Sequence, residues 1–159
     1  MKMTPNFELT PLTYTVMKFP SGELQVQLNK VISTEDGKFP NVITIMGSIT
    51  SSDNLMELLQ LVEALNFYSV LKLQLVLPYC AYSRQDRRCN DGESFSLKVF
   101  ANLINSCNFQ RVVTYDNHSE VATALLNNCY NIPVSALIDN LLPYNFLISP
   151  DDKEKKKVF

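Results

Sequence analysis

The alternation of short apolar strands with amphipathic helices, which begins near residue 42, restricts the fold of this chain more than any other feature. The segments 42–46, 71–79 and 111–116 are short apolar runs, and polar residues follow each of them. Between them, 51–65 and 94–106 carry apolar residues at the i, i+3, i+4, i+7 spacing of a helix. Strands that are largely apolar and alternate with helices predict an α/β fold with a parallel sheet covered on both faces.

Two strand patterns precede this alternation, at 13–19 and 23–28. Pro, Ser and Gly at 20–22 join them, and a proline followed by a glycine is typical of a tight turn, so the chain is predicted to begin with a β-hairpin. Later in the chain, the pattern at 119–128 predicts a short helix and that at 145–152 predicts a fourth strand of the sheet.

The helix at 51–65 carries a signal for its first turn. Asn54 is followed three residues later by Glu57, which predicts an N-cap with its reciprocal acid, worth about 1 kcal/mol. Few residues of this helix are charged, so we expect it to be buried on more than one side.

The composition limits the class of protein. The 159 residues are 46% apolar with a formal net charge of −2, which indicates a globular protein and argues against a general nucleic-acid binder, since such proteins usually carry a basic excess. No apolar run has the length of a signal peptide core or a membrane span, so a cytoplasmic protein with no membrane partner is predicted. The four cysteines lack CxxC spacing and there is one histidine, which favours free thiols over a disulfide framework or a zinc site.

Polar loops follow the predicted strands of the sheet. They are GSITSSDN, YCAYSRQDRRCNDGES, DNHSE and SPDD. The carboxyl ends of parallel strands meet at one edge of a sheet, and α/β proteins bind their ligands there. We therefore expect the functional site at this edge.

Two of these loops hold the strongest candidates, and each also allows a plainer interpretation. The arginines of SRQDRR (83–88) suit phosphate oxygens, but the segment could equally be a solvated loop closed by pairs between Asp86 and an arginine. Asp116 and His118 could bind Mg²⁺ or act as acid and base, with Asp116 setting the tautomer of the imidazole. A helix cap or a hydrogen-bonded histidine would also explain them. Each fragment, taken alone, favours the plainer interpretation.

Taken in order, five motifs resemble those of the ribose-phosphate diphosphokinases, also called phosphoribosyl pyrophosphate synthetases. They are FPSGELQVQL, SDNLMELL, VLPYCAYSRQDRR, VVTYDNHSE and ISPD. The resemblance runs from about residue 19 to the end of the chain. The combination of PYxxYxRQDRR with a later strand-end DxH carries most of its specificity.

The resemblance implies transfer of the β,γ-diphosphoryl group of Mg-ATP to the 1-hydroxyl of ribose 5-phosphate, which releases AMP. It implies two phosphoribosyltransferase-like α/β halves, assembled into dimers and hexamers. Residues 1–144 would then form the ATP-side domain, and residues 145–159 would begin the second domain.

The resemblance also assigns roles to individual residues. The positions implied to bind ATP are Arg84, Gln85, Asp86 and Arg87. Those implied to hold the adenine of a neighbouring subunit are Ser21, Gly22 and Glu23. The catalytic position is His118, and the positions linked to Mg²⁺ are Asp116, His118 and Asp151.

The chain departs from the family pattern at several places. Ser21 replaces an acid, and Asn117 replaces an apolar residue. The positions where further acids would follow the DxH motif hold Asn127, Asn128 or Asn131. These 159 residues contain no counterpart of the second half, so we expect little turnover from the chain alone. Two alternatives stay open: a non-catalytic relative that binds and regulates a synthetase, and a diphosphotransferase with another ribose-containing acceptor.

Overall fold

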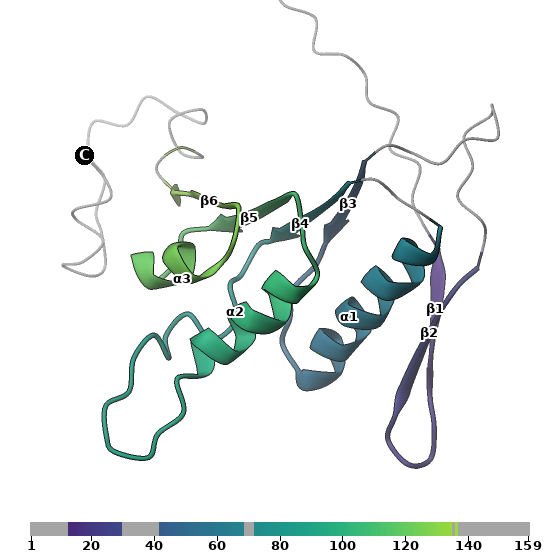
Figure 1. The fold of residues 1–159 in the computed structure, drawn as a ribbon, viewed down its shortest axis with the longest axis horizontal. Coiled ribbons are helices and arrows are strands. Elements are labelled where there is room, and N and C mark those ends of the chain that lie inside the picture. Colours follow the sequence, from purple (N-terminus) through teal and green to yellow (C-terminus); the bar gives the residue numbers. More distant parts are fainter. Residues whose placement is uncertain (1–12, 30–41, 69–71, 135, 137–159) are drawn as a thin grey trace, which may run out of the picture.

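Four parallel strands form the central sheet, and their order across the sheet is their order in the chain. The computed structural model describes residues 13–29, 42–68, 72–134 and 136. The strands are β3 (Ile43–Met46), β4 (Leu73–Leu77), β5 (Arg111–Tyr115) and β6 (Cys129–Ile132). The helices that connect them are α1 (Ser52–Phe67), α2 (Ser96–Ser106) and α3 (Glu120–Leu125) (Figure 1). The predicted α/β fold with a parallel sheet is confirmed.

All three helices lie on the same face of the sheet (Figure 1). Each connection steps to the next strand in the same direction, and right-handed crossovers of this kind place their helices on one side. Leu73, Leu75 and Leu77 of β4 are buried toward the helices, whereas the residues between them are half-buried. The sequence predicted helices on both faces of the sheet. In the described part of the chain, helices cover one face, and no described helix covers the other.

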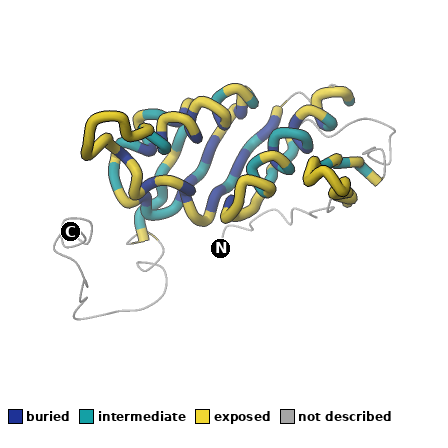
Figure 2. The backbone as a smooth tube through the Cα atoms, turned by 90° about the horizontal axis from the view of Figure 1, so that it is seen from below, coloured by how far each residue is buried: buried dark blue, intermediate teal, exposed yellow. Residues whose placement is uncertain are grey.

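The core lies between the sheet and the helices. Its largest fully buried side chains include Leu65 of α1, Leu75 of β4, and Leu97, Phe100 and Ile104 of α2. Each apolar side chain of this size removed from water contributes about 1.5–3 kcal/mol. Figure 2 shows the buried residues along the strands, whereas the hairpin and the loop between β4 and α2 are mostly exposed.

The predicted hairpin is confirmed: β1 (Tyr14–Lys18) pairs antiparallel with β2 (Leu24–Leu28). It packs against α1, and Gln60 joins the two by accepting a hydrogen bond from Val26 N–H (2.9 Å) and donating one to the Leu24 carbonyl (2.8 Å). Tyr14 donates a hydrogen bond to Glu57 of the same helix (2.8 Å). Helix α1 therefore lies between the hairpin and the sheet, which confirms its predicted burial on more than one side.

The boundaries of two elements differ from the sequence prediction. The N-cap of α1 is Ser51 and not Asn54, because the extended Ser51 accepts the Asn54 N–H on its hydroxyl (3.1 Å) and Asn54 is already helical. The helix predicted at 119–128 is too long, since α3 ends at Leu125 and β6 follows after a short turn. The strand expected at 145–152 and the domain boundary after residue 144 lie outside the described residues. None of the helices described here is long and apolar enough to span a membrane.

Candidate functional site

The two candidate loops leave neighbouring strands at the same edge of the sheet. The last residue of β4, Leu77, pairs with Thr114 near the end of β5. Residues 78–95 follow β4, and residues 116–119 follow β5. The structure therefore brings together two of the loops that the sequence places at the carboxyl edge. We call the candidate residues of these loops the strand-end cluster, which comprises Arg84, Gln85, Asp86, Arg87, Asp116 and His118.

The first turn of the β4 loop is anchored in the protein. Cys80, Ala81 and Ser83 are buried, and Tyr82 adopts a left-handed conformation with φ of 59°. The Gln85 N–H donates to the Tyr82 carbonyl (2.8 Å), and the Gln85 carbonyl accepts the Leu97 N–H at the start of α2 (3.3 Å). These contacts fix the backbone on both sides of position 84.

The side chains that follow this turn point in different directions. Arg84 and Gln85 are exposed, whereas Asp86 is buried. Arg87 donates from Nε to the Asp86 carboxylate at 3.0 Å, although the Arg87 side chain itself is 70% exposed. The plainer interpretation, a loop closed by an Asp86–arginine pair, thus describes part of this geometry, and it leaves Arg84 projecting into solvent.

Asp86 also lies near the β5 loop. The hydrogen bond from Arg87 lowers the pKa of the Asp86 carboxyl, and the hydroxyl of Ser119 in the β5 loop is the second cause of this shift. The Ser119 Oγ is buried and has no hydrogen-bond partner among the described residues, so this second influence acts through proximity. The ionised Asp86 therefore lies against the β5 loop and carries the charge that balances Arg87.

The β5 loop turns sharply as soon as the strand ends. Asp116 has φ of 45°, a left-handed conformation that Asp tolerates better than most residues, and its N–H donates to the Ile132 carbonyl of β6 (3.0 Å). Asp116 is half-buried and His118 is exposed, while Asn117 between them is buried. Ser119 then begins α3 as its N-cap, without a side-chain cap bond. In the order of the chain, Asp116 and His118 thus flank a residue whose amide side chain is buried.

Sequence reasoning missed the polar cluster beneath this turn. Asn117 donates from Nδ2 to Thr114 Oγ1 (2.9 Å) and to Thr123 Oγ1 (3.1 Å), and its backbone N–H donates to Asn131 Oδ1 (3.1 Å). The one signal in the sequence was Asn117 itself, a polar residue where the family pattern has an apolar one. The spacing of its partners could not have shown that they meet.

The three asparagines that the resemblance offers as alternative replacements for family acids lie in two different places. Asn131 is on β6 next to the turn. The Asn128 carbonyl instead accepts the Val112 N–H at the start of β5 (3.0 Å), and Asn127 N–H donates to Asn105 at the end of α2 (2.8 Å). Asn127 and Asn128 therefore lie at the opposite edge of the sheet from the strand-end cluster.

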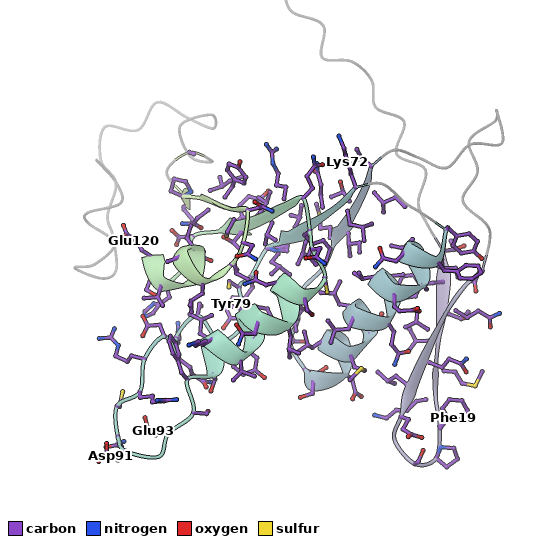
Figure 3. All side chains as sticks on the ribbon, viewed as in Figure 1. Phe19, Lys72, Tyr79, Asp91, Glu93 and Glu120 are labelled. Carbon is purple, nitrogen blue, oxygen red and sulfur yellow. The ribbon has the colours of Figure 1, made fainter. Side chains whose placement is uncertain are left out.

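The hairpin tip, residues 19–23, is far from the strand-end cluster. Figures 1 and 3 place it at one end of the molecule, with Phe19 labelled, and the loop between β4 and α2 at the other end. Gly22 has φ of 94°, and Ser21 donates a hydrogen bond to the Glu23 carboxylate at 2.7 Å. The structure does not bring Ser21, Gly22 and Glu23 to the predicted ATP residues of the same chain.

The distal part of the β4 loop forms an open hollow. Residues 88–93 line a space of about 440 Å³, and Figure 3 shows Asp91 and Glu93 at the far end of the loop. The Glu93 carboxylate accepts the backbone N–H groups of Cys89 (2.7 Å) and Asn90 (3.1 Å). The side-chain amide of Asn90 also donates to this carboxylate, and it is the main cause of the lowered pKa of Glu93. Glu93 is thus occupied in holding its own loop.

Asp116 and His118 offer few metal ligands, so a magnesium ion bound at the strand-end cluster would take most of its ligands from water and substrate phosphates. Within the described ranges, no three His, Cys, Asp or Glu side chains gather into a metal-binding group. Mg²⁺ usually keeps several waters and takes one or two carboxylates together with substrate phosphates. Asp116 fits this pattern as a single oxygen donor with His118 beside it, and the predicted third position, Asp151, lies outside the described residues.

Comparisons with known proteins show which family this chain resembles. Residues 2–107 match the family described as the N-terminal domain of ribose phosphate pyrophosphokinase. A ribose-phosphate pyrophosphokinase of Haemophilus ducreyi is 36% identical over 142 residues, which is 86% of this chain and 43% of that protein. Ribose-phosphate pyrophosphokinase 1 of Streptococcus pyogenes is 34% identical over 126 residues, covering 78% of this chain and 36% of the relative.

A solved structure shows the same fold. The phosphoribosylpyrophosphate synthetase from Mycobacterium smegmatis superposes with a TM-score of 0.68 at 22% sequence identity, over 82% of this chain and 43% of that one. The chain thus spans less than half the length of the curated relatives that it matches. The family match covers more than half of the residues here, and this chain belongs to the family of ribose-phosphate pyrophosphokinase N-terminal domains.

Proposed function

We propose that this chain is the Mg-ATP-binding half of a ribose-phosphate diphosphokinase. The reaction moves the β,γ-diphosphoryl group of ATP to the 1-hydroxyl of ribose 5-phosphate and yields phosphoribosyl pyrophosphate and AMP, a step in nucleotide biosynthesis. The family membership supports this reaction for the protein of which such a domain is part.

One observation carries the proposal. The exposed Arg84 and Gln85 and the turn that holds Asp116 and His118 leave neighbouring strands at one edge of the sheet. The buried Asp86 pairs with Arg87 and lies near Ser119 of the β5 loop. A cation for phosphate, a polar group for the nucleoside, and a carboxylate with an imidazole are thus carried by neighbouring loops at the same edge of the sheet.

This arrangement suits diphosphoryl transfer, in which the protein contributes mainly position and charge. Arg84, with its guanidinium in solvent, is the residue that would bind the phosphate oxygens of ATP, and Asp86 would keep Arg87 oriented beside it. Asp116 and His118 would hold the metal–nucleotide. A bound Mg²⁺ would neutralise charge that develops on the phosphates.

The resemblance supplies the remaining roles. It implies that Ser21, Gly22 and Glu23 contact the adenine of a neighbouring subunit in a homo-oligomer, and the hairpin that carries them lies at the end of the molecule away from the cluster (Figures 1 and 3). The acceptor, ribose 5-phosphate, would bind mainly outside these residues.

Titration calorimetry with Mg²⁺ and a non-hydrolysable ATP analogue tests the proposal. We expect saturable, Mg²⁺-dependent binding, and we expect Arg84→Ala to weaken it by about tenfold or more, the loss expected when a charged bidentate contact is removed. Arg111→Ala is the matched control, because Arg111 lies at the amino end of β5 with its guanidinium 4.8 Å from the centre of the Tyr130 ring. An affinity that Arg84→Ala leaves unchanged would remove the loop from the site, and a wild-type chain that binds no nucleotide would overturn the function.

A further inference from the structure

The buried amide of Asn117 connects the candidate turn to three separate elements. Asn117 is 3% exposed, although it lies between the half-buried Asp116 and the exposed His118. Its side chain bonds Thr114 near the end of β5 and Thr123 in α3, and its backbone bonds Asn131 in β6. One residue of the turn is therefore held by the strand before it, the helix after it and the next strand.

The partners of Asn117 are themselves joined. Thr114 is fully buried, and its hydroxyl accepts from Asn117 Nδ2 while donating to Asn131 Oδ1 (3.4 Å). A buried polar group that loses its partner costs about 1–3 kcal/mol, whereas a connected network makes a unique arrangement rigid. The network thus favours one conformation of the loop above it.

The conformation that it favours is an unusual one. Asp116 sits at φ of 45°, and its own N–H is bonded to the Ile132 carbonyl (3.0 Å). With Asn117 turned into the protein, the residues on either side of it are half-buried and exposed. Their separation and direction are therefore set by the inward side chain between them.

We propose that Asn117 is a positioning residue, whose hydrogen bonds to Thr114, Thr123 and Asn131 fix Asp116 and His118 in the arrangement that receives the metal–nucleotide. This role rests on the proposed function of the strand-end cluster. An apolar residue of similar size would fill the same volume, but it would leave the hydroxyls of Thr114 and Thr123 without this donor. The turn would then sample other conformations.

The test uses the full chain with isotope-labelled histidine. His118 is the only histidine, so every histidine ring signal in the spectrum belongs to it. Mn²⁺ replaces Mg²⁺ because both prefer oxygen and water ligands, and it broadens the signal of a ring that lies close to it. In the wild-type chain, Mn²⁺ with a non-hydrolysable ATP analogue should broaden the His118 signal saturably.

In Asn117→Leu we expect a folded spectrum in which this broadening is about fivefold smaller, consistent with the loss of one or two buried hydrogen bonds. The matched control is Asn102→Leu, since Asn102 is exposed on α2, and it should match the wild type. If Asn117→Leu does not fold, Thr123→Val decides, because it keeps the volume and removes one hydroxyl partner. We expect a smaller loss of broadening in the same direction.

The outcomes separate the two proposals. Wild-type broadening that persists in full in Asn117→Leu, or in Thr123→Val where that variant decides, overturns the positioning role and leaves the proposed function standing. If Mn²⁺ and the nucleotide analogue do not broaden the His118 signal of the wild-type chain, the proposed function is overturned, and the positioning role with it.

Discussion

The family resemblance implies that the strand-end cluster and the hairpin tip both contact ATP, but the fold supports the two regions in different ways. In the cluster, exposed side chains stand on buried polar ones, Asp86 in one loop and Asn117 in the other. At the hairpin tip all of residues 19–23 are exposed, and the hydrogen bonds at the tip are made within it. The cluster is fixed by its own chain, whereas the tip presents its side chains outward.

This difference has a consequence for how each region binds. Charged groups that are fixed before a ligand arrives stabilise phosphate charge without the cost of reorganisation, so buried support suits the cluster. An exposed tip gains its contacts only when another surface completes them. Changes in the support of the cluster should therefore affect nucleotide binding within one chain, while changes at the tip should affect local stability and assembly.

The largest expected difference concerns thiol reactivity at the two ends of the β4 loop. Cys80, at its root, is buried, and burial raises the pKa of its thiol from 9.0 to about 12, whereas Cys89 is exposed. Only the thiolate is alkylated, so at about pH 8 the raised pKa alone reduces the reactive fraction of Cys80 by roughly a thousandfold. Mass spectrometry after timed treatment with iodoacetamide should show Cys89 modified first and Cys80 last.

The same treatment in denaturant is the control, since all four thiols should then react at similar rates. Cys107 and Cys129, half-buried with pKa values raised by burial, should react at intermediate rates in the folded chain. If Cys80 reacts as fast as Cys89 in the folded chain, the root of the loop opens, and the cluster is no better supported than the hairpin tip.

The periodic features of the sequence predicted the frame of the cluster correctly. Continuous apolar runs identified β3, β4 and β5, because the strands of parallel sheets are typically rich in apolar residues. Because the carboxyl ends of parallel strands meet at one edge of a sheet, Arg84 and His118 were then expected on neighbouring loops. The turn at Gly22 was equally readable, because few residues other than glycine adopt a φ of 94°.

The features that sequence reasoning missed depend on contacts between distant residues. β6 is four residues long and includes Asn131, so it lacks the apolar run of its neighbours, and only its pairing with β5 defines it. The predicted N-cap of α1 lay three residues after the observed one, Ser51, because several polar residues there could each have capped the helix. The burial of Asn117 requires partners from three elements, and no local pattern records such a meeting.

A smaller effect is expected at the hairpin tip. Gly22→Ala should lower the stability of the chain by about 1 kcal/mol, because an L residue is strained in the left-handed region. A Cβ at Gly22 would meet no atom within 4 Å, so the cost comes from the backbone alone. Urea unfolding measures it, and Gly47→Ala is the control, since that Cβ also meets nothing within 4 Å and position 47 has no positive φ. Equal costs at the two positions would contradict the backbone origin, and weaker nucleotide binding by the isolated chain would contradict the separation of the tip from the cluster.

The smallest effect is the pH dependence that Asp86 contributes. Arg87, and then Ser119, lower the pKa of its carboxyl below the ordinary 3.8, so the folded state holds Asp86 ionised where the unfolded chain begins to protonate it. The stability that it adds is fully present above 3.8 and is lost as the pH falls through the lower folded value. Arg87 is 70% exposed, and solvent screens such a pair, so the effect should be smaller than that of Gly22→Ala.

Thermal unfolding of the wild type and Asp86→Asn between about pH 6 and 3 measures this contribution. The difference in stability between the two should be constant at the upper end and should shrink at the lower end, because protonation makes the wild-type carboxyl as neutral as the amide. Asp91→Asn, on the exposed part of the same loop, should run parallel to the wild type at every pH. A difference that grows on acidification would mean that folding raises the pKa of Asp86. The surroundings of this carboxylate would then disfavour its charge, and the cluster would need another source of support.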